Sequence, residues 1–247
     1  MNFLKNNILK IYSKISTITE DILYKHNNNN LNSLLNKVGY IKLKLNFNIF
    51  ENLKIEKKIS RNNFFKILII SEDEIHKLLK KIFVKNNILD KISSLTGFNY
   101  KISYLISYET FSIPDNLKTK EIYANHWHFD KPYSKNTIKL IIPLEKIDTN
   151  LGAMKIFNID NSKKLKLNDA IESDFNVTGD EKDLFIFFPN LCAHKAGIPK
   201  KNKSRKQLML QLNPSKKWCY SKYLFSKQFK IEPKFPLKDI FEKIHLF

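Results

Sequence analysis

Residues suited to hold a metal ion occur at two places in the sequence. His126, His128 and Asp130 alternate within HWHFD, and alternate residues of a strand face the same side of a sheet. A further histidine, His194, follows 64 residues after Asp130, just past the apolar run Leu184–Phe188. Two histidines and one carboxylate on one face of a β-roll form the facial triad that binds non-haem Fe(II) and leaves coordination positions open. The candidate ligands are His128, Asp130 and His194. His126, on the same expected face, stays open as a further candidate at this point.

The His-x-Asp pattern is unspecific by itself. His128 and Asp130 are equally compatible with a surface pair, and His194 with a hydrogen-bonded core histidine. Arg205 adds information, because it stands eleven residues after His194 and opens a strand-like alternation with Gln207 on the same face. A guanidinium grips a carboxylate through two parallel hydrogen bonds, which Lys cannot reproduce. The alternative is a solvated basic residue among lysines, and the second arginine, Arg61, has no comparable setting.

The elements expected around these residues are helices first and strands later. Apolar residues at three- and four-residue spacings predict an amphipathic helix over residues 3–25, whose apolar face we expect to cover a sheet rather than lie on a membrane. Alternation over 41–49 predicts a strand, and Ser71 with Glu74 forms a capping box before further helices that end at Gly97. Beyond Gly97 short alternating or apolar runs predict about eight strands.

This order of elements predicts one mainly β unit over residues 1–247, an all-β roll with a helical jacket. We expect residues 1–98 to be mostly helical and to pack on the roll. Residues 99–213 would form the β core with the metal site, and residues 214–247 a C-terminal segment.

Composition limits the class of protein. With 247 residues and 43% hydrophobic content, general disorder is excluded. The formal net charge of +19 is weak evidence for an anionic partner, because Lys, Asn and Ile all have A/T-rich codons and inflate the basic count. Two cysteines cannot form a zinc site alone. No signal peptide or apolar run of about 20 residues is visible, so we expect a soluble, cytoplasmic protein without a transmembrane segment.

The succession of segments over roughly residues 100–213 resembles the phytanoyl-CoA dioxygenase-like family of Fe(II)/2-oxoglutarate-dependent oxygenases. In that family a strand with His-x-Asp is followed by an apolar strand, a Gly-led strand, a Gly-Asp segment ending in His, and an Arg about eleven residues later. The matching segments are HWHFD (126–130), TIKLIIPL (137–144), LGAMKIF (151–157), GDEKDLFIFFPNLCAH (179–194) and GIPKKNKSRKQLMLQLN (197–213).

The resemblance implies a double-stranded β-helix, jelly-roll or cupin-like, and a set of site residues. His128, Asp130 and His194 would bind Fe(II), and Arg205 would hold the distal carboxylate of 2-oxoglutarate. Tyr104, Tyr108 and Lys139 are candidates for a second 2-oxoglutarate contact. The family often places Ser or Thr where Ala196 stands, and residues 158–162 replace its usual Pro-Gly-Ser-His turn.

The implied activity is hydroxylation of a C–H bond in a small molecule, and the excess of Lys is compatible with an anionic one. The reaction consumes O₂ and 2-oxoglutarate and releases succinate and CO₂, with ascorbate as an accessory reductant.

Three alternatives stay open. The first is a cupin-type metal-binding β-roll that does not use 2-oxoglutarate. The second is a nucleic-acid enzyme of the same superfamily, which is disfavoured because Gln211 stands where the nucleic-acid demethylases carry a second Arg; we therefore expect no nucleic-acid partner. The third is a basic surface-binding protein without catalysis, built on the N-terminal helix and the Lys-rich stretch 216–234.

Overall fold

The computed structural model describes residues 2–26, 33–48, 50–51, 53–130, 134–165, 172–221, 224 and 244–247, with side chains from Lys10 onward. Most of the Lys-rich stretch 216–234, and the apolar side chains expected before residue 10, lie outside this range. The helices are α1 (Asn2–Tyr24), α2 (Leu34–Val38), α3 (Glu72–Leu79), α4 (Ile88–Thr96) and α5 (Ile159–Lys164), with a π-helical turn η2 (Lys80–Lys85) and a 3-10 turn η3 (Asp115–Leu117).

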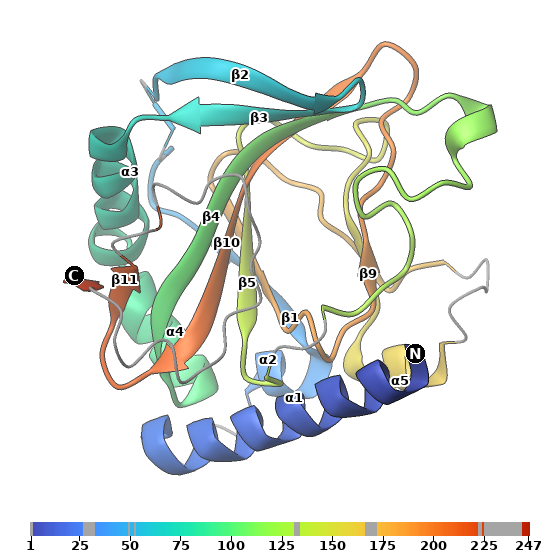
Figure 1. Ribbon diagram of the computed structural model, residues 1–247. Helices are drawn as coiled ribbons and strands as arrows, with labels where there is room; N and C mark the ends of the chain where they lie inside the picture. The colour runs from blue at the N-terminus through green and yellow to red at the C-terminus, as the bar shows by residue number, and fades with distance from the viewer. Residues whose placement is uncertain are drawn as a thin grey trace.

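A nine-stranded sheet dominates the described part of the chain (Figure 1). Its main path runs β1-β8-β5-β10-β4-β11-β12, and the β2–β3 hairpin joins it through β4. All pairings are antiparallel except that of β11 with β4. The strands are β1 (Tyr40–Lys44), β2 (Ile55–Asn62), β3 (Phe65–Ile70), β4 (Asn99–Phe111), β5 (Ile138–Pro143), β8 (Asp183–Phe187), β10 (Ser204–Ser215), β11 (Cys219–Ser221) and β12 (Ile244–Leu246).

The long central strands β4 and β10 determine which side chains share a face. Their register pairs Arg205 with Thr110, Gln207 with Tyr108, and Gln211 with Tyr104. Gln211 also lies opposite Lys139 of β5. Because paired residues of an antiparallel sheet point to the same side, these polar side chains all face one side of the sheet. The leucines between them in β10 face the other side.

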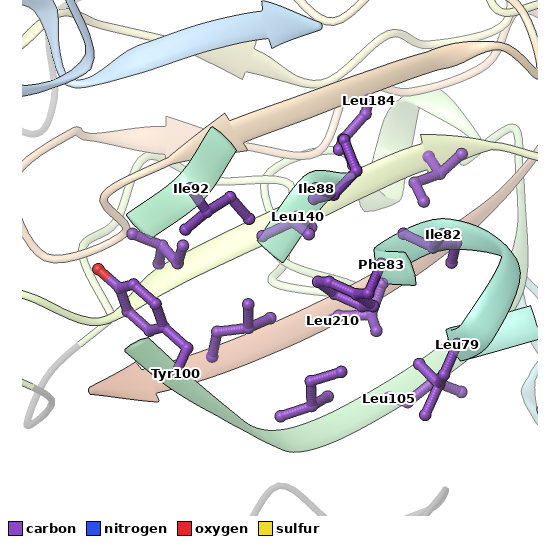
Figure 2. Packing of buried hydrophobic residues seen from close by; sticks show 14 of the residues in the cluster. Leu79, Ile82, Phe83, Ile88, Ile92, Tyr100, Leu105, Leu140, Leu184 and Leu210 are labelled. Carbon is purple, nitrogen blue, oxygen red and sulfur yellow. The ribbon is translucent and has the colours of Figure 1, made fainter. Parts of the chain in front are cut away.

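Helices α3 and α4 and the turn η2 cover that leucine-bearing face. Ser71 caps α3 by accepting a hydrogen bond from the backbone N–H of Glu74, as the sequence predicts. Figure 2 shows Ile82, Phe83 and Ile88 packed over Leu140 and Leu210 of the strands. Each fully buried side chain of this kind contributes about 1.5–3 kcal/mol. This cluster is the main core of the protein.

A small second sheet lies against the opposite, polar face. It consists of β7 (Phe175–Asn176), β6 (Lys155–Ile156) and β9 (His194–Lys195), in that order. An isolated antiparallel bridge joins His128 to His194. The predicted β-roll with helices packed on it is confirmed, although the described strands form two unequal sheets and no closed barrel.

Two local predictions need correction. The strand expected over 41–49 ends at Lys44, because its partner β8 begins at Asp183, which lies opposite Lys44. The expectation that the apolar face of the N-terminal helix covers a sheet is wrong for its described side chains. Helix α1 crosses one end of the molecule (Figure 1) and buries Ser16 and Glu20, while Ile11, Ile15, Ile18 and Ile22 face outward.

Among the helices that the structure describes, none combines the length and apolarity needed to cross a bilayer.

Candidate metal centre

His128, Asp130 and His194 converge on one point between the two sheets. One potential ligand atom from each of the three lies within 4.8 Å of the other two. Nε2 of His128 is 3.6 Å from Oδ1 of Asp130, and Nε2 of His194 is 3.7 Å from the same oxygen. The structure therefore brings together the three residues that the sequence singled out.

Backbone pairing places these side chains. His128 and His194 exchange both backbone hydrogen bonds of an antiparallel pair, at 3.1 and 3.0 Å, and their rings lie 4.4 Å apart. The N–H of Asp130 donates to the carbonyl of Pro189 at 3.0 Å. The ligand segments are thus attached to each other by main-chain bonds, which position them independently of any bound ion.

Both imidazoles present Nε2 to the centre. Nδ1 of His128 lies 2.8 Å from the carbonyl oxygen of His126, and Nδ1 of His194 lies 3.0 Å from that of Cys192. A carbonyl oxygen only accepts, so each Nδ1 carries the proton and each Nε2 keeps its lone pair. Burial lowers the pKa of His194 to about 3, so this ring is neutral at physiological pH, as a metal ligand must be.

The Asp130 carboxylate divides its two oxygens between the histidines and a lysine. Oδ1 faces the two rings, whereas Oδ2 forms an ion pair with Nζ of Lys139 on β5. Burial raises the pKa of Asp130, but the Lys139 cation and the neighbouring histidines outweigh it and hold that pKa below its ordinary value. Two imidazole nitrogen donors and an ionised oxygen donor fit a divalent transition metal of the two-histidine, one-carboxylate type.

His126 and Trp127 do not join this group. The backbone around His126 is irregular rather than a regular strand, so the expected shared face with His128 does not form. Nδ1 of His126 instead lies 3.8 Å from Glu121, and its ring is half-exposed. Trp127 packs on Phe157, with the Nζ of Lys195 4.6 Å from its ring centroid.

A cavity of about 460 Å³ opens beside the metal ligands. Tyr104, Tyr108 and Lys139 all line it, together with apolar side chains such as Phe187 and Met209. Ala196 also lines it, two residues after His194. The wall of the cavity is mostly apolar, and its polar lining includes the proposed metal ligands and Arg61 and Asn62 of β2.

Arg205 is fully buried but does not line this cavity. Its Nη1 donates to the carbonyl of Gly152, while Nε and Nη2 have no partner within the described chain. Gly152 adopts φ 74°, and a Cβ there would collide with the backbone of Ile198 and Pro199. A buried guanidinium with two unused N–H groups is unusual, because unpaired buried donors are costly.

Two tyrosines lie near both the cavity and Arg205. Tyr108 and Tyr123 line the cavity and lie close enough to Arg205 to interact electrostatically with it. The hydroxyl of Tyr108 accepts a hydrogen bond from the Gln207 side chain, and that of Tyr123 donates to the carbonyl of Phe111 at 2.8 Å. Burial raises the pKa of both, so both are protonated.

Sequence reasoning missed Tyr123, the Gly152 carbonyl and the pairing of Lys139 with Asp130. Tyr123 lies in an irregular segment with no periodic pattern. The sequence identified Gly152 as the start of the Gly-led strand. Its contact with Arg205 was not predictable from a local pattern, because the two residues are 53 positions apart in the sequence. Lys139 was considered only as a co-substrate contact.

No known protein-family model and no curated protein matches this chain. Among solved structures, the non-haem α-ketoglutarate-dependent epimerase SnoN from nogalamycin biosynthesis is similar at 12% identity and a TM-score of 0.50, over 73% of this chain and 80% of that one. HygX from Streptomyces hygroscopicus, solved with nickel and 2-oxoglutarate, gives 8% identity and a TM-score of 0.49, over 78% and 89%. The likeness to SnoN confirms the expected fold class, a cupin-like β-roll with N-terminal helices.

Proposed function

We propose that this protein is an Fe(II)/2-oxoglutarate-dependent oxygenase that oxidises a small molecule. The observation that carries the proposal is the convergence of two histidine nitrogens and the ionised Asp130 beside a mostly apolar cavity. The fold shared with SnoN, which is α-ketoglutarate-dependent, supports the same class. Hydroxylation of a C–H bond, with release of succinate and CO₂, is the specific reaction proposed.

His128, Asp130 and His194 would hold the metal. When bound, Fe(II) would supply the redox chemistry that couples O₂ and 2-oxoglutarate to substrate oxidation. Lys139 holds Oδ2 of Asp130, so that Oδ1 stays directed toward the two Nε2 atoms. The apolar wall limits water around the reacting carbon, which favours oxidation of the bound molecule over side reactions.

Arg205 would receive the distal carboxylate of 2-oxoglutarate. A carboxylate satisfies two N–H groups of one guanidinium at once, and Nε and Nη2 are the two without a partner. Because Arg205 does not line the cavity, the side chains around it have to shift for direct contact with a co-substrate in the cavity. Tyr104 and Tyr108 are the remaining candidates for a second contact, since Lys139 is already paired with Asp130.

The first test is an anaerobic titration of the metal-free protein with Fe(II) and then 2-oxoglutarate, followed by visible absorption. A metal-to-ligand charge-transfer band is expected after 2-oxoglutarate is added. It should be absent in His194→Ala and retained in the matched control His126→Ala, whose ring lies outside the centre. If Fe(II) does not bind to the wild type, the proposal fails.

A metal-binding β-roll that does not use 2-oxoglutarate is the second candidate function. The observation that favours it is the position of Arg205 outside the cavity lining. In that case Fe(II) binds in the same titration but 2-oxoglutarate produces no band.

A further inference from the structure

Helix α1 presents a stripe of isoleucines to the outside of the molecule. Ile11, Ile15, Ile18 and Ile22 are spaced by four, three and four residues, so they share one helical face. Their exposed fractions are 59, 58, 49 and 75%. Of the nine large apolar side chains that the described residues leave exposed, five lie in α1, with Leu23 as the fifth. The exposure is therefore concentrated rather than scattered.

Tyr24 at the end of α1 packs against the main core, whereas the middle of the helix is attached through polar side chains. Glu20 and Ser16 are its most buried described side chains, and Glu20 accepts a hydrogen bond from Ser134. Thr17 accepts one from the backbone N–H of Lys135 at 3.0 Å. If α1 were rotated so that the isoleucines faced inward, the Glu20 carboxylate would face solvent. The hydrogen bond between Ser134 and Glu20 would then be lost. The outward stripe is thus fixed by specific bonds on the opposite face.

Charged side chains lie beside the stripe. Lys10, Lys14 and Asp21 are exposed on one side of it, and Asp21 accepts a hydrogen bond from Asn136 at 3.1 Å, whereas Glu20 is buried on the opposite face. The described outer surface of the helix therefore combines isoleucines with two lysines and one carboxylate, on a chain of net charge +19. A helix that is apolar on one face and lined by lysines matches the interface of a bilayer that contains anionic lipids.

We propose that α1 docks this protein on the surface of an anionic phospholipid bilayer. The isoleucine stripe enters the boundary between headgroups and acyl chains, and Lys10 and Lys14 lie at the level of the lipid phosphates. The helix lies in the plane of the interface and does not span it, consistent with its moderate apolarity. The docking is independent of the metal chemistry.

A second copy of the chain suits the stripe less well. From Ile11 to Ile22 the stripe is about 17 Å long and the helix about 10 Å wide, whereas a stable dimer buries about 800 Å² on each partner. A bilayer requires no complementary shape and accepts a narrow amphipathic strip. The lysines also favour lipid phosphate over a copy that carries the same lysines.

The experiment is co-sedimentation of the full-length protein with vesicles of phosphatidylcholine alone or mixed with phosphatidylglycerol. We expect binding to the mixed vesicles that weakens as salt is raised. Ile15→Gln/Ile18→Gln should weaken it at least about tenfold, because two apolar side chains no longer enter the interface. Both positions are exposed, so the fold should be retained, which far-ultraviolet circular dichroism checks.

The matched control is Leu34→Gln/Val84→Gln, which removes two similarly exposed apolar side chains elsewhere and should bind vesicles like the wild type. Equal binding by the Ile15→Gln/Ile18→Gln variant and the wild type would overturn the proposal, as would a wild type that binds neither vesicle. A wild-type dimer by light scattering that this variant dissociates, without vesicle binding, would assign the stripe to self-association instead.

Discussion

The two faces of strand β10 are equally buried and chemically opposite. On one face Leu208, Leu210 and Leu212 are 0% exposed and pack under α3, η2 and α4. On the other face Arg205, Gln207 and Gln211 are 0, 1 and 4% exposed and point toward the smaller sheet. Burial of the leucines contributes stability directly, whereas burial of polar groups costs free energy unless they are paired. The face with Arg205, Gln207 and Gln211 is thus the one suited to bind a ligand. Substitutions on each face test this difference.

The largest loss of stability is expected from the leucine face. Leu210→Ala removes a fully buried side chain beneath Phe83 and should lower the free energy of unfolding by about 2–5 kcal/mol, measured by urea denaturation. Fe(II) affinity of the folded protein should not change, because Leu210 points away from the metal ligands. A loss of metal affinity at full stability would contradict this division of the strand.

Lys139→Met tests the polar face. Among the described residues, Lys139 is the one lysine that forms an ion pair with a proposed metal ligand, Asp130. The variant leaves the Asp130 carboxylate buried without its cation, which should cost about 3 kcal/mol at neutral pH. In the wild type the pKa of Asp130 is lowered on folding, so this carboxyl stabilises the fold above its unfolded pKa, near ~4, and loses that contribution as pH falls through its folded pKa.

In Lys139→Met only the neighbouring histidines oppose the effect of burial, so the pKa of Asp130 in the folded variant is higher than in the wild type. Acidification from neutral pH should therefore reduce the difference in unfolding free energy between the variant and the wild type. The measurement is urea unfolding of both metal-free proteins at several pH values between neutral and ~5. A difference in unfolding free energy between the two proteins that stays constant with pH would show that Lys139 does not control the protonation of Asp130.

Arg205→Met should separate binding from stability most clearly. Removing a buried cation with two unpaired N–H groups should leave stability unchanged or raise it, since Met fills similar space without charge. Under the proposed function, 2-oxoglutarate affinity should fall by about 1–3 kcal/mol, while Fe(II) affinity is retained. Unfolding and ligand titrations of the same preparations check both parts, and unchanged 2-oxoglutarate affinity would refute the role of Arg205.

The smallest effect is expected from Ala196→Ser. The new hydroxyl would face the cavity two residues after His194, at the position where the family that this sequence resembles often has Ser or Thr. One added neutral hydrogen bond should raise 2-oxoglutarate affinity by about 0.5–1.5 kcal/mol, measured by the same titration. A decrease would show that the co-substrate does not approach this side of the centre.

Patterns local in sequence were predicted well. The alternation of β10, the capping of α3 by Ser71 and the apolar strand before His194 each follow from spacing over a few residues. The three metal-ligand candidates were identified because their order along the chain is distinctive. The β2–β3 hairpin was not predicted, because β2 is mostly exposed and lacks an apolar alternation that would mark a strand.

Helix α1 marks the limit of such patterns. Its sequence determined that it is a helix with one apolar stripe, because backbone propensity and side-chain spacing are local properties. Only the tertiary structure decided that the stripe faces outward, through the bond between Glu20 and Ser134, 114 residues apart. The same holds for the metal centre. The sequence determined which residues can bind a metal, whereas the burial of Arg205 and the pairing of Lys139 with Asp130 depend on contacts formed only when distant strands are packed together.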